Sequence, residues 1–417
     1  MKEVKKFVYI ALVAGGMLGS FISCDYLDVS KELSENLTLE QVFNNPGYTK
    51  RWQANIYNCI PNYSEMGKEA TTGFTGIWNL MSGQVVANTT AVGTQMLTGF
   101  NSSNASFHRW ATLYKYIRQG FIFLDNAKDY MGSEQDVSYI SKKDMDRLKA
   151  ETKFLIAYSY FSLFELYGPV PLITEIEDPE NKTIDYPRAS VDEIVNYIDR
   201  LLQEVLDSNA LPETLFTESA SGSLDYEHNN DRYNLKEIVR PTKVTVLALR
   251  AKLWVYAASP LFNGGYGEAL QLTNKDGKHL FPDEDKTKWN TAKTHLETLF
   301  TFAEAKGHKL YYSKPGSNGL PDPNLSVYEL FQYYNDEILW ANGNNSYRIV
   351  GNDMERRTCP RGANGFCNIG LYQEGVDAFF TKNGLTIEED PEYNEDGFGN
   401  LTNVCSSTLH NDKHIFN

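Results

Sequence analysis

The segment that decides the fold runs from residue 242 to residue 265 and reads TKVTVLALRAKLWVYAASPLFNGG. Its apolar residues recur three and four positions apart, which predicts a helix with a buried face over residues 242–258 that Pro260 ends. The small side chains of Ala248, Ala251, Ala257 and Ala258 allow another helix to approach closely. We therefore expect this helix to pack against others in a mostly α-helical fold.

The flanking sequence predicts further helices. Capping boxes at Thr38–Gln41 and Ser190–Glu193 mark two helix starts. Helical apolar spacing also covers residues 107–124, 148–166, where Gly168-Pro169 ends the helix, and 289–306. We expect Trp110, Tyr158 and Tyr160 on these helices to be packing residues. Helices of this length that meet as antiparallel pairs would pack like tetratricopeptide repeats, although no strict repeat occurs at a fixed period.

Two regions lack helical periodicity. Residues 62–104 are rich in Gly, Thr, Ser and Asn, and beyond Gly307 the chain is loop-rich with short apolar runs at 328–331 and 338–340. Loops of this length are usually functional, so aromatic side chains within them are better ligand candidates than those on helices. The sequence thus predicts helix pairs that support a loop-rich ligand lobe.

The first residues read as an export signal. Three lysines precede the apolar stretch Phe7 to Leu18, which is too short to span a bilayer, and FISC at 21–24 resembles a lipobox. We expect a lipoprotein signal peptide over 1–23, lipidation of Cys24, a tether over 24–36 and a helical domain with its ligand lobe over 37–417. The alternative is an ordinary secretory signal that contains a cysteine.

Charge and motifs exclude several functions. A formal net charge of -15 and a pI near 5.0 repel phosphate backbones, so we expect no nucleic-acid partner. The sequence contains no His-Glu-x-x-His, Gly-x-Ser-x-Gly or phosphate-binding glycine loop, and we predict no catalytic residues and no enzyme activity. Glu388, Glu389 and Asp390 could form a glycosidase carboxylate pair, but a solvated acidic loop is the favoured interpretation. The oxygen donors at 390–397 resemble a calcium loop but lack the terminal glutamate of an EF-hand, so calcium is not favoured and we expect no cofactor.

Several segments resemble the SusD/RagB family of nutrient-binding lipoproteins. The mature start CDYLDV at 24–29 is similar to that of the family, as are ETKFLIAYSYF at 151–161 followed by YGPVPLI at 167–173. The segment at 242–265 resembles the family helix with its Ser-Pro-Leu-Phe-Asn ending, and QEGVDAF at 373–379 extends the likeness towards the C-terminus. The chain stops at Asn417, whereas the family normally continues well past this segment, so completeness of the C-terminal part is in question.

The resemblance implies a function at the cell surface. Family members are lipid-anchored to the outer membrane and cover a TonB-dependent transporter of the SusC kind, to which they deliver glycan or sometimes peptide. The expected partners are therefore an oligosaccharide and a SusC-like barrel, in a system for polysaccharide utilisation and nutrient uptake. A tetratricopeptide-like scaffold that binds protein or peptide is the alternative.

Sugar binding needs flat apolar rings beside planar amides or arginine. The first long loop offers Trp78 and Asn79, and the later one offers Tyr333, Tyr334, Tyr347 and Arg348. We expect these residues to bind ligand, with packing of the lobe as the alternative role. Cys359 and Cys367 can form a disulfide after export, but Cys59 and Cys405 are competing partners.

Overall fold

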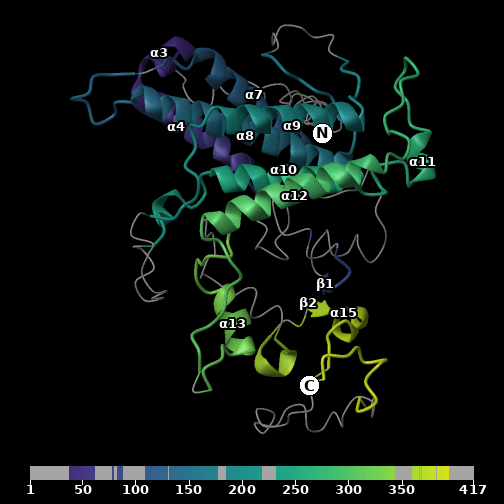
Figure 1. Cartoon of the computed structure of the whole chain (residues 1–417). Coiled ribbons are helices and arrows are strands. Elements are labelled where there is room, and N and C mark those ends of the chain that lie inside the picture. The colour runs from purple at the N-terminus through teal and green to yellow at the C-terminus, as the bar shows by residue number, and fades with distance from the viewer. Residues whose placement is uncertain are drawn as a thin grey trace, which may run out of the picture. The chain divides into compact units, whose positions relative to one another are not determined.

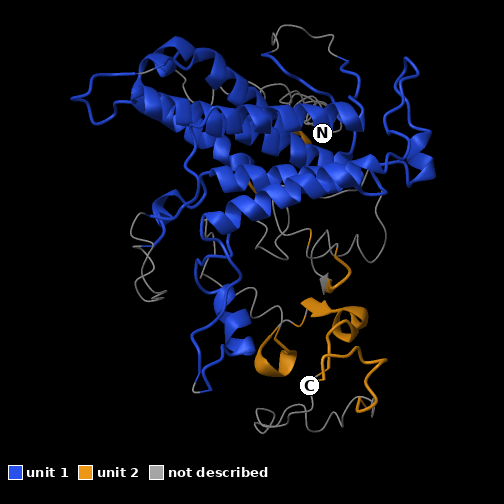
Figure 2. Ribbon diagram, in the orientation of Figure 1, with its two compact units in different colours: residues 1–59, 112–341 blue, residues 60–111, 342–417 orange. Residues whose placement is uncertain are grey.

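The computed structural model describes residues 37–61, 78, 82–87, 109–129, 131–176, 185–217, 232–316, 318–342, 359–365, 367, 369–381 and 383–393. The chain divides into two compact units (Figure 2). The first unit comprises residues 1–59 with 112–341, and the second comprises 60–111 with 342–417. Cys24 and the predicted signal peptide and tether lie outside the described residues.

The first unit is built from helices (Figure 1). They are α3 (Leu39–Asn44), α4 (Pro46–Ile56), α7 (Trp110–Asn126), α8 (Lys142–Tyr167), α9 (Val191–Asp207), α10 (Lys243–Ala258), α11 (Gly267–Leu270), α12 (Thr287–Ala305) and α13 (Pro323–Leu330), with 3-10 turns η2 (Tyr57–Cys59) and η4 (Leu235–Glu237). Helix α8 packs on α9, α9 on α10, and α10 on α12. The predicted mostly α-helical fold is confirmed.

Local chemistry sets the helix ends. At the start of α3 the backbone N–H of Thr38 donates to Gln41 at 2.8 Å, and the N–H of Gln41 donates back to the Thr38 hydroxyl at 3.3 Å. Ser190 and Glu193 form the same reciprocal pair before α9. Gly168 ends α8 with a φ of +64°, a conformation that glycine adopts without steric cost. Both predicted capping boxes are therefore confirmed.

Small residues set the helix spacing. Ala251, Ala257 and Ala258 are buried, and Ala251 packs with Val244 and Leu299 between α10 and α12. Between α7 and α8, a Cβ atom added to Gly120 would lie 2.7 Å from Cγ1 of Ile156, so only glycine permits this approach.

The expected packing residues behave differently from one another. Tyr160 is fully buried, and its hydroxyl donates to the carbonyl of Ile173 at 2.6 Å and accepts the Ile173 N–H at 2.9 Å. Tyr158 is also buried. The prediction that Trp110 is a core residue was wrong, because its side chain is only half-buried. Trp110 is the first residue of α7, at the end of the helix rather than in its middle.

A buried ion-pair cluster joins α8 to the two 3-10 turns. The carboxylate of Glu151 is fully buried and accepts from Arg147 Nε at 2.9 Å, from Arg240 at 2.7 Å and from the Tyr57 hydroxyl at 2.7 Å. Glu237 pairs with both arginines, and although burial opposes the shift, these two partners hold the pKa of Glu237 below its usual value. Two carboxylates thus balance two guanidinium groups, as a buried charge requires.

Helix α13 was not predicted. The sequence predicts a loop around the apolar run at 328–331, but residues 328–330 form the last turn of a helix that begins at Pro323. Asp322 caps this helix by accepting from the N–H groups of Asn324 and Leu325 at 2.8 and 3.0 Å. The Asp-Pro pair, with proline in the first helical turn, was the available signal.

The described part of the second unit is small. Strands β1 (Val85–Ala87) and β2 (Ile369–Leu371) pair antiparallel, with Val85 opposite Leu371. A 3-10 turn η5 (Arg361–Ala363) precedes β2, and a short helix α15 (Gln373–Asp377) follows it. Across the described residues of both units, no helix is long and apolar enough to cross a membrane.

Candidate functional site

An arm of the first unit, residues 309–337, carries a set of exposed aromatic side chains. The arm follows α12 and contains α13 (Figures 1 and 2). The exposed fractions are 60% for Tyr312, 63% for Tyr328, 82% for Phe331 and 43% for Tyr333. Monomeric proteins rarely expose many large apolar side chains in one segment unless that surface binds something.

The base of the arm is fixed by the buried carboxylate of Asp336. Arg232 donates to it with Nε at 2.9 Å and with its terminal nitrogen at 2.7 Å, and the Tyr233 hydroxyl donates as well. The backbone carbonyl of Asp336 is 2.8 Å from Nδ1 of His308. Trp340, just beyond the arm, donates to the carbonyl of Val239 at 2.8 Å. The arm therefore ends on a bidentate ion pair, which holds its orientation.

Hydrogen bonds also brace the inside of the arm. The Tyr311 hydroxyl donates to Glu329 on α13 at 2.7 Å. The backbone N–H of Ser313 donates to the Ser326 hydroxyl at 3.0 Å, and Ser326 in turn donates to the carbonyl of Asp322 at 2.7 Å. Because α13 is held in this way, its exposed rings are presented on an ordered scaffold.

The adjacent residues Tyr333 and Tyr334 differ in exposure, although the sequence predicted that both bind ligand. Tyr333 is exposed, whereas Tyr334 packs edge-on against Tyr233, with ring centroids 4.9 Å apart. The Tyr334 hydroxyl lies 3.5 Å from the carbonyl of Ile338, and burial raises the pKa of Tyr334 to about 12. Tyr333 is thus the more exposed of the two rings, and Tyr334 is mainly a packing residue.

The other predicted ligand residues are less fully described. Trp78 is half-buried in the second unit. Asn79, Tyr347 and Arg348 lie outside the described residues. The exposed Tyr312 and Tyr328 were missed, because sequence spacing alone does not tell an exposed apolar side chain from a buried one.

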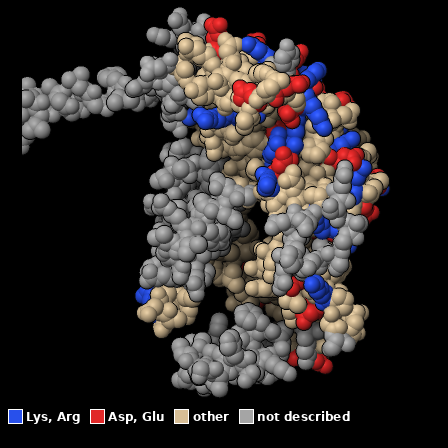
Figure 3. Space-filling view, turned by 90° about the vertical axis from the view of Figure 1, so that its left-hand side faces the viewer, with Lys and Arg blue, Asp and Glu red and all other residues tan. Residues whose placement is uncertain are grey.

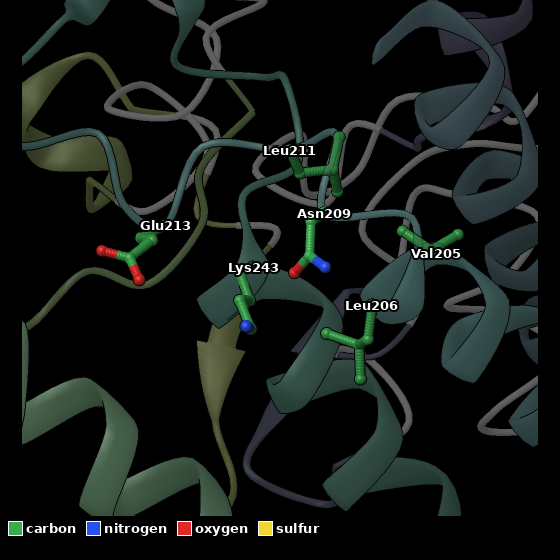
Figure 4. A pocket seen from close by; sticks show the side chains of 6 residues that line it. All are labelled: Val205, Leu206, Asn209, Leu211, Glu213 and Lys243. Atoms are coloured by element: carbon green, nitrogen blue, oxygen red, sulfur yellow. The ribbon is translucent and has the colours of Figure 1, made fainter. Parts of the chain in front are cut away.

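A small hollow lies where α9 ends and α10 begins (Figure 4). It has a volume of about 200 Å³ and is lined by Val205, Leu206, Asn209, Leu211, Glu213 and Lys243. The Glu213 side chain points away from Asn209 and Lys243 in this view, in keeping with its ion pair to Lys306 at 2.6 Å. The hollow is smaller than the pockets that usually hold organic ligands.

A larger cleft of about 590 Å³ opens beside α9. Its walls come from the extended segment after α8 at Leu172, from residues 187–189, from one face of α9 between Glu193 and Arg200, and from the turn at 274–278. The lining combines side chains of both charges with apolar surface, to which Leu172, Pro187 and Ala189 contribute. This volume lies in the range of small-molecule sites.

The oxygen donors that begin at Asp390 were the sequence's candidate for a calcium site. Asp390 of the predicted calcium loop accepts from the amide of Asn383 at 3.1 Å, and the loop continues outside the described residues. Among the residues that are described, no three His, Cys, Asp or Glu side chains gather closely enough to hold a metal ion.

The three cysteines that the structure describes, Cys59, Cys359 and Cys367, are free thiols. Cys59 is buried, and burial raises the pKa of its thiol to about 12. Cys359 and Cys367 are not bonded to each other, although the N–H of Cys367 donates to the carbonyl of Cys359 at 3.1 Å.

The charged surface is mixed. On the face drawn in Figure 3, acidic and basic side chains are interspersed over the described surface. Ion pairs among the described residues include Lys275 with Asp185 at 2.6 Å and Lys153 with Glu204 at 2.8 Å.

Comparison with known proteins finds relatives by family and by fold. Residues 25–223 match the SusD-like_3 family model, described as "Starch-binding associating with outer membrane". No curated protein matches the sequence.

Three solved structures share the fold. BT4246 is 21% identical with a TM-score of 0.58, over 83% of this chain and 59% of that one. A SusD-like protein from Bacteroides fragilis NCTC 9343 is 16% identical with a TM-score of 0.50, over 85% and 56%. A SusD-like carbohydrate binding protein from the same strain is 14% identical with a TM-score of 0.50, over 85% and 57%. The aligned part of each structure is thus between 56% and 59% of its length.

Proposed function

Because the family match and the shared fold assign this chain to the SusD/RagB family, we propose that it is a surface glycan-binding lipoprotein without catalytic activity. In this proposal it captures oligosaccharide and delivers it to a SusC-like TonB-dependent transporter. The observation that carries the proposal is the arm with its exposed rings at 312, 328, 331 and 333.

The arm supplies the chemistry that a sugar needs. An aromatic face packs against the C–H side of a pyranose, while neighbouring polar groups bond its hydroxyls. A sugar that covers one ring removes on the order of 80 Å² of apolar surface from water, worth about 2 kcal/mol. Two such rings give about 4 kcal/mol, and each hydrogen bond to the sugar adds about 1 kcal/mol. Association entropy offsets several kcal/mol of this sum, so we expect dissociation constants between about 10 μM and 1 mM. Such affinity allows both capture and release.

The membrane part of the proposal rests on the sequence. The lipobox-like FISC at 21–24 supplies a lipid anchor at Cys24, and several acyl chains at one cysteine give stable attachment without a membrane-spanning helix. The predicted location is therefore the outer membrane at the cell surface, beside a transporter. Co-purification of a large β-barrel with the lipidated protein in mild detergent tests the partnership.

Glycan binding is tested on the mature chain with an oligosaccharide array followed by calorimetry. Phe331→Ala should weaken binding of the captured glycan about tenfold or more and leave thermal unfolding nearly unchanged, because Phe331 is 82% exposed. Phe300→Ala is the matched control, since Phe300 is 60% exposed but lies on α12. If Phe331→Ala and Phe300→Ala bind the glycan with equal affinity, the arm is not part of the binding site.

The tetratricopeptide-like scaffold is the alternative function. It predicts no glycan signal on the array and binding of a peptide or protein instead. Product analysis with the same oligosaccharides tests for hydrolysis, which the proposal does not expect.

A further inference from the structure

We infer that the cleft beside α9 is a second glycan-binding site, distinct from the arm, that takes an acidic sugar carrying one carboxylate. The inference rests on the proposed function, since it takes the ligand to be a glycan. It follows from Arg188 and Asn196, exposed cleft side chains for which the described part of the structure gives no hydrogen bond or ion pair.

The cleft is a built structure rather than a gap between loops. The amide of Asn274 donates to the carbonyl of Arg188 at 2.7 Å, which ties the turn at 274–278 to the segment before α9. The N–H of Val191 donates to the carbonyl of Leu280 at 2.9 Å, and Lys278 forms an ion pair with Glu193 on α9. These bonds join three of the four walls, namely the segment before α9, α9 itself and the turn at 274–278.

Two donors in the cleft are uncommitted. Within the part of the chain that the structure describes, no hydrogen bond or ion pair engages the side chains of Arg188 and Asn196, and both are exposed. Arg200 lies over the ring of Tyr197, with its guanidinium carbon 5.1 Å from the centroid, and is 3.7 Å from Glu204. An arginine with a free planar fork is the side chain best suited to bind a carboxylate through two parallel hydrogen bonds.

The balance of charge favours a single negative group. The lining contains three cations, Arg188, Arg200 and Lys278, and two carboxylates, Glu193 and Asp276, so its net charge is one positive (3 − 2). The carboxylates can accept bonds from sugar hydroxyls, and the amides can donate and accept. A polyhydroxylated ring with one carboxylate matches this lining, whereas a densely sulfated chain would meet Glu193 and Asp276 as repulsive neighbours.

Stacking is not the basis of this site. Tyr197 is only 8% exposed, because Arg200 covers one side of its ring and Tyr160 packs against it edge-on at 5.3 Å. Binding should therefore depend on charge, and it should weaken as salt rises. This dependence separates the cleft from the aromatic arm, where salt should have little effect.

The test uses pairs of oligosaccharides that differ only in charge. Oligosaccharides containing galacturonate, glucuronate or N-acetylneuraminate are each compared with the methyl ester of the same compound, and a sulfated oligosaccharide forms a separate arm. We expect at least one acid to bind about tenfold more tightly than its ester in low salt. Arg188→Gln should abolish that difference and leave affinity for neutral glycans unchanged.

Arg51→Gln is the matched control, because Arg51 is also an exposed arginine over a tyrosine ring, Tyr48 at 5.8 Å, but lies on α4 outside the cleft. If neutral glycans bind and no acid is preferred over its ester, or if Arg51→Gln and Arg188→Gln act alike, the cleft assignment is overturned while the proposed function stands. Preference for the sulfated compound alone overturns the carboxylate. Failure of every glycan to bind overturns both proposals.

Discussion

Replacing Tyr333 and Tyr334 one at a time tests whether the arm presents rings for binding. The two residues are adjacent and chemically identical, but Tyr333 is 43% exposed, whereas Tyr334 packs on Tyr233 at 4.9 Å. Tyr333→Ala should therefore change affinity, and Tyr334→Ala should change stability.

The magnitudes follow from the exposed area and the packing. An exposed fraction of 43% of a side chain of about 200 Å² is about 85 Å², and at about 25 cal/mol per Å² its burial under a sugar is worth about 2 kcal/mol, or about 30-fold in affinity. Incomplete cover lowers this to about tenfold. Tyr334→Ala removes a largely buried ring that contributes to fixing the arm, at a cost of about 2–3 kcal/mol.

Calorimetric titration with an array-selected glycan and thermal unfolding of both variants measure these effects. The reasoning is refuted if Tyr333→Ala binds normally, or if it loses as much stability as Tyr334→Ala. Tyr333→Phe is a useful control, because it keeps the stacking face and should retain most of the affinity.

Three further predictions address the scaffold and the anchor. Burial opposes ionisation of Asp199, but two hydrogen bonds from Arg250 at 2.6 and 2.8 Å help to hold the pKa of Asp199 below its usual value. Ionised Asp199 therefore stabilises the folded state above about pH 4, and this contribution is lost as the pH falls through the lowered pKa. Asp199→Asn should cost about 1–3 kcal/mol at pH 7 and flatten the loss of stability in acid, as measured by urea unfolding at pH 7 and pH 3; an unchanged acid profile would contradict this. Gly120→Ala should cost about 1–3 kcal/mol in the same assay, because the new Cβ meets Ile156 at 2.7 Å, and a neutral effect would show that α7 and α8 can separate freely. Cys24→Ala should move the protein from the detergent phase to the aqueous phase in a partitioning experiment, and its persistence in detergent would point to another membrane attachment.

The sequence by itself determined the long helices α7 to α10 and α12, and it is the sole basis of the predicted export signal. The helix starts at Thr38 and Ser190 and the helix end at Gly168 depend only on residues within one or two turns. They can therefore be predicted from the local sequence. The predicted helix over 242–258 matches α10, Lys243–Ala258, because its apolar face and its proline stop are local features as well.

Only the tertiary structure decided which side chains are available to a ligand. Tyr334 packs against Tyr233, which lies far away in the sequence, whereas the neighbouring Tyr333 is 43% exposed. The arm is held because Arg232 reaches Asp336 across 104 positions of sequence. The cleft beside α9 likewise joins segments at 172, 187–200 and 274–278. Contacts between residues so far apart in the sequence depend on the path of the whole chain. Local periodicity does not indicate which distant segment lies beside a given residue.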